Sequence, residues 1–121
     1  MDSSCYAAIV LGERGAAAID ARLASFGGLV ASNLMEAEVR AVLTREKISL
    51  PVDLLEPVEW VLPVRALSVE MSRVFSAGYL RGADAWHLAC ALFYADDRTS
   101  LTFLTLDARQ REVAERLGFA I

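Results

Sequence analysis

The stretch Leu80–Phe93 (LRGADAWHLACALF) is apolar on nearly every side when it is drawn as a helix. A helix of this kind belongs in a protein core, so the rest of the chain must pack around it. Asp84 is its only carboxylate and lies in the first turn, where free N–H groups and the helix dipole stabilise an anion. Asp84 can therefore be explained by helix stability alone, without a functional role. A carboxylate at the rim of a core also suits a metal site, provided that other acids converge on it.

Length and composition predict one α/β domain that spans residues 1–121. Hydrophobic residues make up 55% of the chain, yet no apolar run approaches the roughly twenty residues that a membrane helix requires. We therefore expect no membrane association. The N-terminus has no signal-peptide pattern, and the two cysteines, Cys5 and Cys90, lack metal-type spacing. Both observations favour reduced thiols and a cytoplasmic location.

The net charge of −4 argues against a broad basic surface for nucleic acid. It does not exclude a nucleic-acid substrate, because carboxylates that hold divalent cations can face phosphates.

Hydrophobic periodicity and turn residues predict alternating helices and strands. Seven helices are expected, at 5–11, 16–26, 34–47, 51–62, 68–78, 80–93 and 108–117. The fourth is interrupted at Pro57, and the fifth runs from Ser68 to near Gly78. Ser32 or Asn33 is expected to cap the third of these helices, and Ser68 the fifth. Strands are expected at 29–31, 63–67, 101–106 and 119–121. This alternation predicts a parallel sheet flanked by helices, with ligands at the carboxyl ends of its strands.

Two acids on the predicted helix 34–47 have different surroundings. Glu36 has Arg40 four residues later, the spacing of a solvated ion pair. Glu38 points about 200° away from Glu36 and lies beside the apolar face, where an unpaired carboxylate is costly. Glu38 is therefore the candidate for a functional site.

Four acids thus occupy unusual positions: Asp2 near the first element, Glu38, Asp84, and Asp107 at a strand end. If they converge, they offer the oxygen ligands that Mg²⁺ or Mn²⁺ prefers. Such a site supports phosphodiester hydrolysis by activating water and neutralising charge on the departing oxygen.

The segments MDSS, SNLMEAEV, LRGADAWHLA and FLTLDARQREVAERLGF resemble, in order and spacing, the four acidic motifs of PIN domains, particularly the VapC-type ribonuclease toxins. The resemblance implies a three-layer fold with a short central parallel sheet. It implies that Asp2, Glu38, Asp84 and Asp107 are metal ligands and catalytic residues, with Ser3 and Thr105 as supporting groups. Family members have a central strand before the first Asp, whereas only Met1 precedes Asp2 here. Either the translation start lies too far downstream, or the first strand is truncated.

Single residues elsewhere have simpler explanations. His87 follows Asp84 by one turn, and we interpret it as a buried, hydrogen-bonded residue rather than a metal ligand. Trp60, Trp86 and Tyr79 are interpreted as core or interface residues rather than platforms for RNA bases.

The leading hypothesis is a Mg²⁺- or Mn²⁺-dependent endoribonuclease toxin that acts on RNA, forms a homodimer and is neutralised by a cognate antitoxin. The alternative is a catalytically impaired PIN-like module that serves in binding or dimerisation. A phosphoacceptor receiver domain ranks third, because it needs a lysine at a strand end and the only lysine, Lys47, lies at a helix end.

Overall fold

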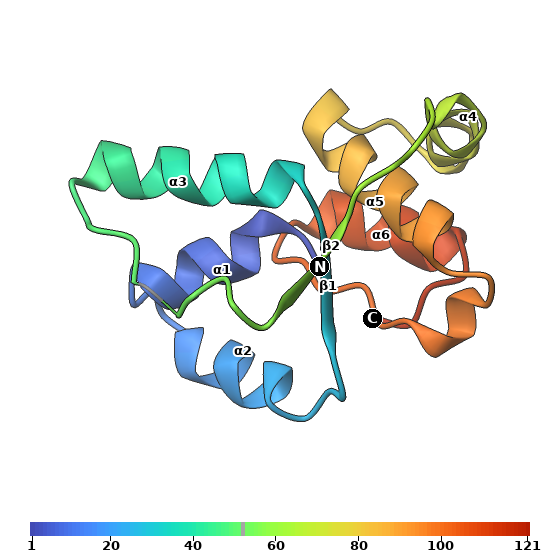
Figure 1. Ribbon diagram of the computed structural model, residues 1–121. Coiled ribbons are helices and arrows are strands. Elements are labelled where there is room, and N and C mark those ends of the chain that lie inside the picture. Colours follow the sequence, from blue (N-terminus) through green and yellow to red (C-terminus); the bar gives the residue numbers. More distant parts are fainter. Residues whose placement is uncertain (52) are drawn as a thin grey trace.

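The computed structural model describes residues 1–51 and 53–121 and shows two groups of helices with short strands between them (Figure 1). On one side lie α1 (Ser3–Val10), α2 (Ala16–Leu23) and α3 (Leu34–Glu46). On the other side lie α4 (Ser68–Ala77), α5 (Gly82–Tyr94) and α6 (Ala108–Arg116). The predicted three-layer α/β arrangement is confirmed.

The sheet consists of β1 (Leu29–Ser32) and β2 (Val58–Val61), which run parallel with Leu29 opposite Val58. Side chains of β1 alternate between two cores, as expected of a strand with helices on both faces. Val30 packs against the core that α5 dominates, whereas Ala31 belongs to the core beside α3. The two cores therefore meet at the sheet, and the site described below lies where both helix layers reach it.

Helix α5 is the central element of the larger core, as the sequence predicted. Five of its residues are buried: Ala85, His87, Leu88, Ala89 and Cys90. It contacts β1, β2, α3, α4 and α6. Asp84 lies in its first turn, at the end nearest the other predicted acids.

The segment from 51 to 62 does not form the predicted helix. Residues 58–61 form strand β2 instead, and the part of the prediction that falls on Val52 lies outside the described residues. The physical reason is that β-prone residues directly after Pro57 pair along their length with β1. The predicted strand at 63–67 is also wrong, since these residues form no strand and Val64 is 92% exposed.

The predicted strands at 101–106 and 119–121 are reduced to one parallel bridge between Thr102 and Ala120. The segment is nevertheless held in place, because Phe103 N–H donates to the Ala120 carbonyl at 2.7 Å. The Met1 ammonium donates to the Val30 carbonyl, and Asp2 N–H donates to the Leu104 carbonyl, each at 2.9 Å. Met1 and Asp2 thus link β1 to residues 101–106 near the middle of the molecule (Figure 1).

Helix boundaries otherwise follow the predictions closely. The helix predicted at 16–26 ends at Leu23, and the one predicted at 34–47 ends at Glu46. Asn33 precedes α3 but makes no capping hydrogen bond with its side chain, and Ser32 bonds elsewhere. Ser68 is the first residue of α4 rather than its cap. None of the described helices is long and apolar enough to cross a membrane.

Candidate metal centre

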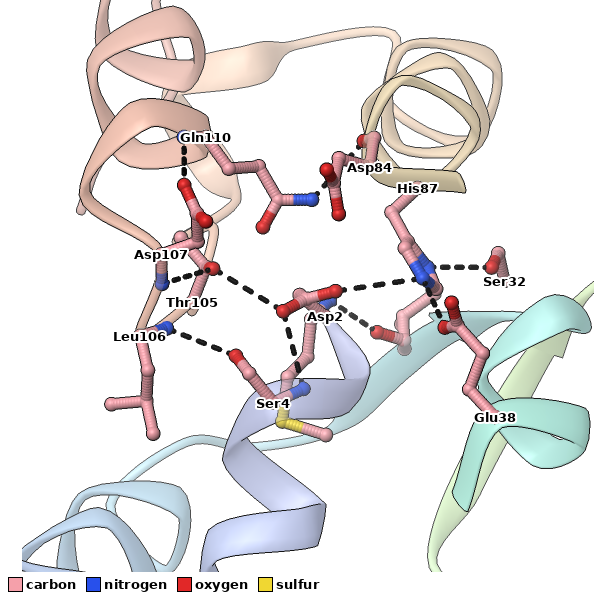
Figure 2. Close-up of polar contacts among 12 residues, drawn as sticks. Asp2, Ser4, Ser32, Glu38, Asp84, His87, Thr105, Leu106, Asp107 and Gln110 are labelled. Carbon is pink, nitrogen blue, oxygen red and sulfur yellow. Dashed lines mark hydrogen bonds and ion pairs between the residues drawn. The ribbon is translucent and has the colours of Figure 1, made fainter. Parts of the chain in front are cut away.

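Asp2 is fixed by the start of α1 and by the segment before α6. Its carboxylate caps α1 by accepting the Ser4 N–H at 3.2 Å, and the Thr105 hydroxyl donates to the same oxygen at 3.3 Å (Figure 2). Asp2 is only 5% exposed, although it lies next to the end of the described chain. Two hydrogen bonds at its carboxylate and one at its backbone therefore hold this acid in the site.

Glu38 lies on α3, and its carboxylate contacts His87 of α5. His87 Nε2 lies 2.7 Å from the Glu38 carboxylate and 3.5 Å from that of Asp2. Its Nδ1 lies 2.8 Å from Ser32 Oγ. A carboxylate only accepts, so Nε2 carries the hydrogen, and in neutral imidazole Nδ1 accepts from the Ser32 hydroxyl. His87 is buried and hydrogen-bonded as predicted, and in this arrangement its ring orients Glu38 and Asp2.

Asp2, Glu38 and His87 form one compact group on the side of α1 and α3. Each offers a ligand atom within 4.8 Å of the others. By contrast, Glu36 forms a surface ion pair with Arg40 at 2.7 Å, as its spacing predicted. Two acids of one helix therefore serve different purposes, and only the one beside the apolar face reaches the site.

Asp84 lies on the opposite side of the site, partly buried in the first turn of α5. Its carboxylate accepts no hydrogen bond from the residues that the structure describes. Burial raises the pKa of Asp84, as do the negative charges of Asp2, Asp107 and Glu38, whereas His87 lowers it. Figure 2 shows the four predicted acids around one region, with Asp84 and Asp107 outside the compact group.

Asp107 is exposed at the N-terminus of α6, and its carboxylate caps that helix by accepting the Gln110 N–H at 2.8 Å. Thr105 connects it to Asp2. The Thr105 hydroxyl accepts the Asp107 N–H at 3.0 Å while it donates to Asp2. Thr105 was expected to be a supporting group, and its hydroxyl forms hydrogen bonds with two of the acids.

The other predicted supporting residue, Ser3, makes no side-chain hydrogen bond within the described part of the chain. Its neighbour Ser4 makes the contacts instead. The Ser4 N–H donates to the Asp2 carboxylate, and the Ser4 hydroxyl accepts the Leu106 N–H at 3.0 Å. The difference follows from the helix start, because the capping carboxylate of Asp2 accepts the N–H two residues later.

Gln110 is a site residue that the sequence reasoning missed. It is fully buried, and its Nε2 donates to the backbone carbonyl of Asp84 at 3.1 Å. That carbonyl requires a donor, so the amide oxygen Oε1 must face the other way, and it has no partner among the described residues. Figure 2 shows the amide between Asp84 and Asp107. The spacing D-x-x-Q at a helix start was the available signal, but it indicates a capping box rather than this position.

The residues present fit a divalent cation that prefers oxygen ligands. Several carboxylates face one small region, which is unfavourable without a counter-charge. The unpartnered Gln110 Oε1 is a buried acceptor, and a buried acceptor without a donor costs about 1–3 kcal/mol. A water molecule, free or bound to a cation, would supply such a donor. The acids and the amide together suit a hydrated Mg²⁺ or Mn²⁺ better than a dry core.

Comparison with known families supports this arrangement. A search of curated proteins and a search of solved structures each give no match. The PIN domain family model matches residues 1–116, which is almost the whole chain. PIN domains are usually metal-dependent nucleases, which agrees with a cluster of carboxylates between two helix layers. The chain belongs to the PIN-domain family.

Proposed function

We propose that this protein is a Mg²⁺- or Mn²⁺-dependent endoribonuclease that hydrolyses RNA phosphodiester bonds. The observation that carries the proposal is the convergence of Asp2 and Glu38, from separate elements, on one buried histidine. Asp84 and Asp107 complete the acidic site from the N-termini of α5 and α6.

A divalent cation bound here supplies charge neutralisation and activation of water for in-line attack on phosphorus. The protein holds the acidic side chains in position. His87 holds Glu38 and Asp2, and Thr105 spaces Asp2 from Asp107. Asp84 and Asp107 face the site from its more exposed side, where a substrate phosphate has access. No nucleophilic side chain is needed, because water is the attacking group.

We further propose that the enzyme is a VapC-type toxin of the cytoplasm, homodimeric and neutralised by a cognate antitoxin. Exposed apolar side chains support a protein partner. Leu62 is 65% exposed, Val64 is 92% exposed and Val69 is 60% exposed, all between β2 and the first turn of α4. Apolar surface of this kind is commonly covered in a complex. A basic side chain of the antitoxin, inserted among the acids, would compete with the cation.

The test uses two glutamates of α3 as a matched pair. Calorimetric titration of Mn²⁺ and cleavage of a structured RNA are measured for wild type, Glu38→Gln and Glu36→Gln. We expect Glu38→Gln to lose most Mn²⁺ affinity and cleavage. Glu36→Gln should match wild type, because its carboxylate serves an exposed ion pair with Arg40.

Equal Mn²⁺ affinity in both variants would contradict the assignment of Glu38. Failure of wild type to bind Mn²⁺ and to cleave any RNA would contradict the nuclease proposal. That second result would favour the alternative function, a PIN-like module that acts only in binding or dimerisation.

A further inference from the structure

The connection between α4 and α5 holds one aromatic ring in solvent, five residues before Asp84. Tyr79 is 73% exposed, although the residues on both sides of it are fixed. Leu80 is 4% exposed and belongs to the main core. At Gly78 a Cβ would lie 2.8 Å from Val113 Cγ2, so this backbone packs directly against α6. The ring position is therefore set by the backbone, while the ring itself contributes little to the core.

Two arginines of α6 bind the same connection. Arg109 Nε donates to the Tyr79 carbonyl at 3.3 Å, and Arg116 donates to the Ala77 carbonyl at 3.0 Å. These bonds fix the backbone of the connection and leave the Tyr79 ring free. Of the two positions expected for Tyr79, core or interface, its exposed side chain excludes the core.

The position of this ring relative to the acids follows from the chain. Tyr79 is two residues before Arg81, and Asp84 comes one helical turn after Arg81. Arg109 is two residues after Asp107. The connection therefore leads directly into the helix that carries Asp84, and its backbone is bound by the first turn of the helix that Asp107 caps.

Two arginines accompany this ring. Arg81 is exposed and makes no ion pair among the described residues, and the nearest acid to Arg109 is Glu112 at 3.9 Å. Glu112 is already paired with Arg116. An exposed aromatic ring on a backbone that Arg109 binds, two residues before the exposed Arg81, matches the chemistry of a nucleotide, whose base stacks and whose phosphate is anionic.

We propose that Tyr79, Arg81 and Arg109 form a binding edge for the unpaired nucleotide next to the scissile phosphate. The Tyr79 ring stacks on its base, and the two arginines contact its flanking phosphates. This inference rests on the proposed ribonuclease function and adds the residues that select a single-stranded region. A base inside a duplex presents no free face to the ring, so duplex RNA is disfavoured.

The test measures binding of a fluorescently labelled single-stranded RNA oligonucleotide to the full chain, with Ca²⁺ in place of Mg²⁺. Tyr79→Ala should weaken binding roughly 5- to 100-fold, the range for loss of one stacked base. Tyr79→Phe should bind like wild type, because it keeps the ring. Tyr94→Ala is the matched control, since Tyr94 is 40% exposed at the other end of α5 and should leave binding unchanged. Thermal unfolding of Tyr79→Ala should match wild type.

Further measurements separate the contributions at this edge. Arg81→Gln should lower the slope of log affinity against log salt by roughly 0.7, as expected for one lost phosphate contact. A blunt RNA duplex should bind weakly, with no response to Tyr79→Ala.

Wild-type affinity in Tyr79→Ala would overturn this inference while the nuclease proposal stands. A Tyr79→Ala variant that keeps RNA affinity but changes the oligomeric state would likewise overturn it, in favour of a protein interface. If wild type bound and cleaved no RNA, the proposed function itself would fail.

Discussion

The two sides of the acidic site are built differently. On the closed side, Glu38 is hydrogen-bonded to His87, whose Nε2 lies 3.5 Å from Asp2, and Asp2 accepts hydrogen bonds from Thr105 and from the start of α1, which it caps. On the open side, Asp84 accepts no hydrogen bond from described residues, and burial and neighbouring charges raise its pKa. An acid with structural partners has a folding role whether or not it binds metal, whereas an acid without them only costs stability. Asp84 is therefore the most informative residue for function.

The largest effect is expected for Asp84→Asn. Cleavage should fall on the order of a hundredfold or more, the scale seen when a group that stabilises developing charge is removed. The control is Asp96→Asn, which changes an exposed acid beyond the other end of α5 and should keep full activity. Retained cleavage in Asp84→Asn would show that the closed side suffices.

The same substitution should stabilise the metal-free protein at neutral pH. The folded-state pKa of Asp84 is raised, so its contribution to stability is present below the unfolded pKa of about 3.9 and is lost as pH rises through the folded value. At pH 7 the carboxylate therefore opposes folding. Asp84→Asn should raise the melting temperature there, and the difference should vanish in acid. A lower melting temperature at pH 7 would contradict the proposed contrast between the two sides.

The next largest effect is expected for His87→Ala on the closed side. Mn²⁺ affinity should fall by roughly 10- to 100-fold, because Glu38 and Asp2 lose the group that orients them. The free energy of unfolding should also fall, by about 1–3 kcal/mol, since Ser32 Oγ is left buried without its partner. Calorimetry and urea unfolding measure both. His87→Gln, which keeps one donor, should recover part of the affinity; no recovery would argue for His87 as a direct ligand.

A smaller effect is expected for Gln110→Leu, which removes the amide between the open-side acids. The turnover number should fall on the order of tenfold, within the range for a lost hydrogen bond of about 0.5–1.5 kcal/mol, with little change in KM. Stability should change little, because the lost bond to the Asp84 carbonyl offsets removal of the unpartnered Oε1. Steady-state kinetics with a short RNA separates the two parameters. A rise in KM alone would assign Gln110 to substrate binding.

The sequence predicted the helices better than it predicted the strands. Helix α5 and the pair of Glu36 and Glu38 followed from a period of 3.6 residues, which local sequence carries. Strand β2 was missed because it depends on pairing with β1, far away in the chain. Residues 101–106 looked like a strand, yet they have only one bridge and a few backbone hydrogen bonds as partners.

Within the site, the helix face on which a residue lies could be predicted from the sequence. The residues that its side chain contacts could not. Glu38 was singled out because it lies beside an apolar face, but nothing in the sequence paired it with His87. Gln110 was not singled out from the sequence, because only the tertiary fold brings its amide to the Asp84 carbonyl. The Asp2 carboxylate accepts the backbone N–H of Ser4, because a helix begins at Ser3 and Asp2 is its N-cap.

The smallest effect is expected at Asp107, whose two roles can be separated by one pair of variants. Asp107→Asn keeps an oxygen that can accept the Gln110 N–H, so α6 stays capped while the negative charge is lost. Asp107→Ala loses both and should cost about 1 kcal/mol in the free energy of unfolding relative to Asn. Cleavage should fall equally in the two variants, because both lack the charge. If activity followed stability instead, with Asn near wild type, Asp107 would be only a helix cap, and the open side would depend on Asp84 alone.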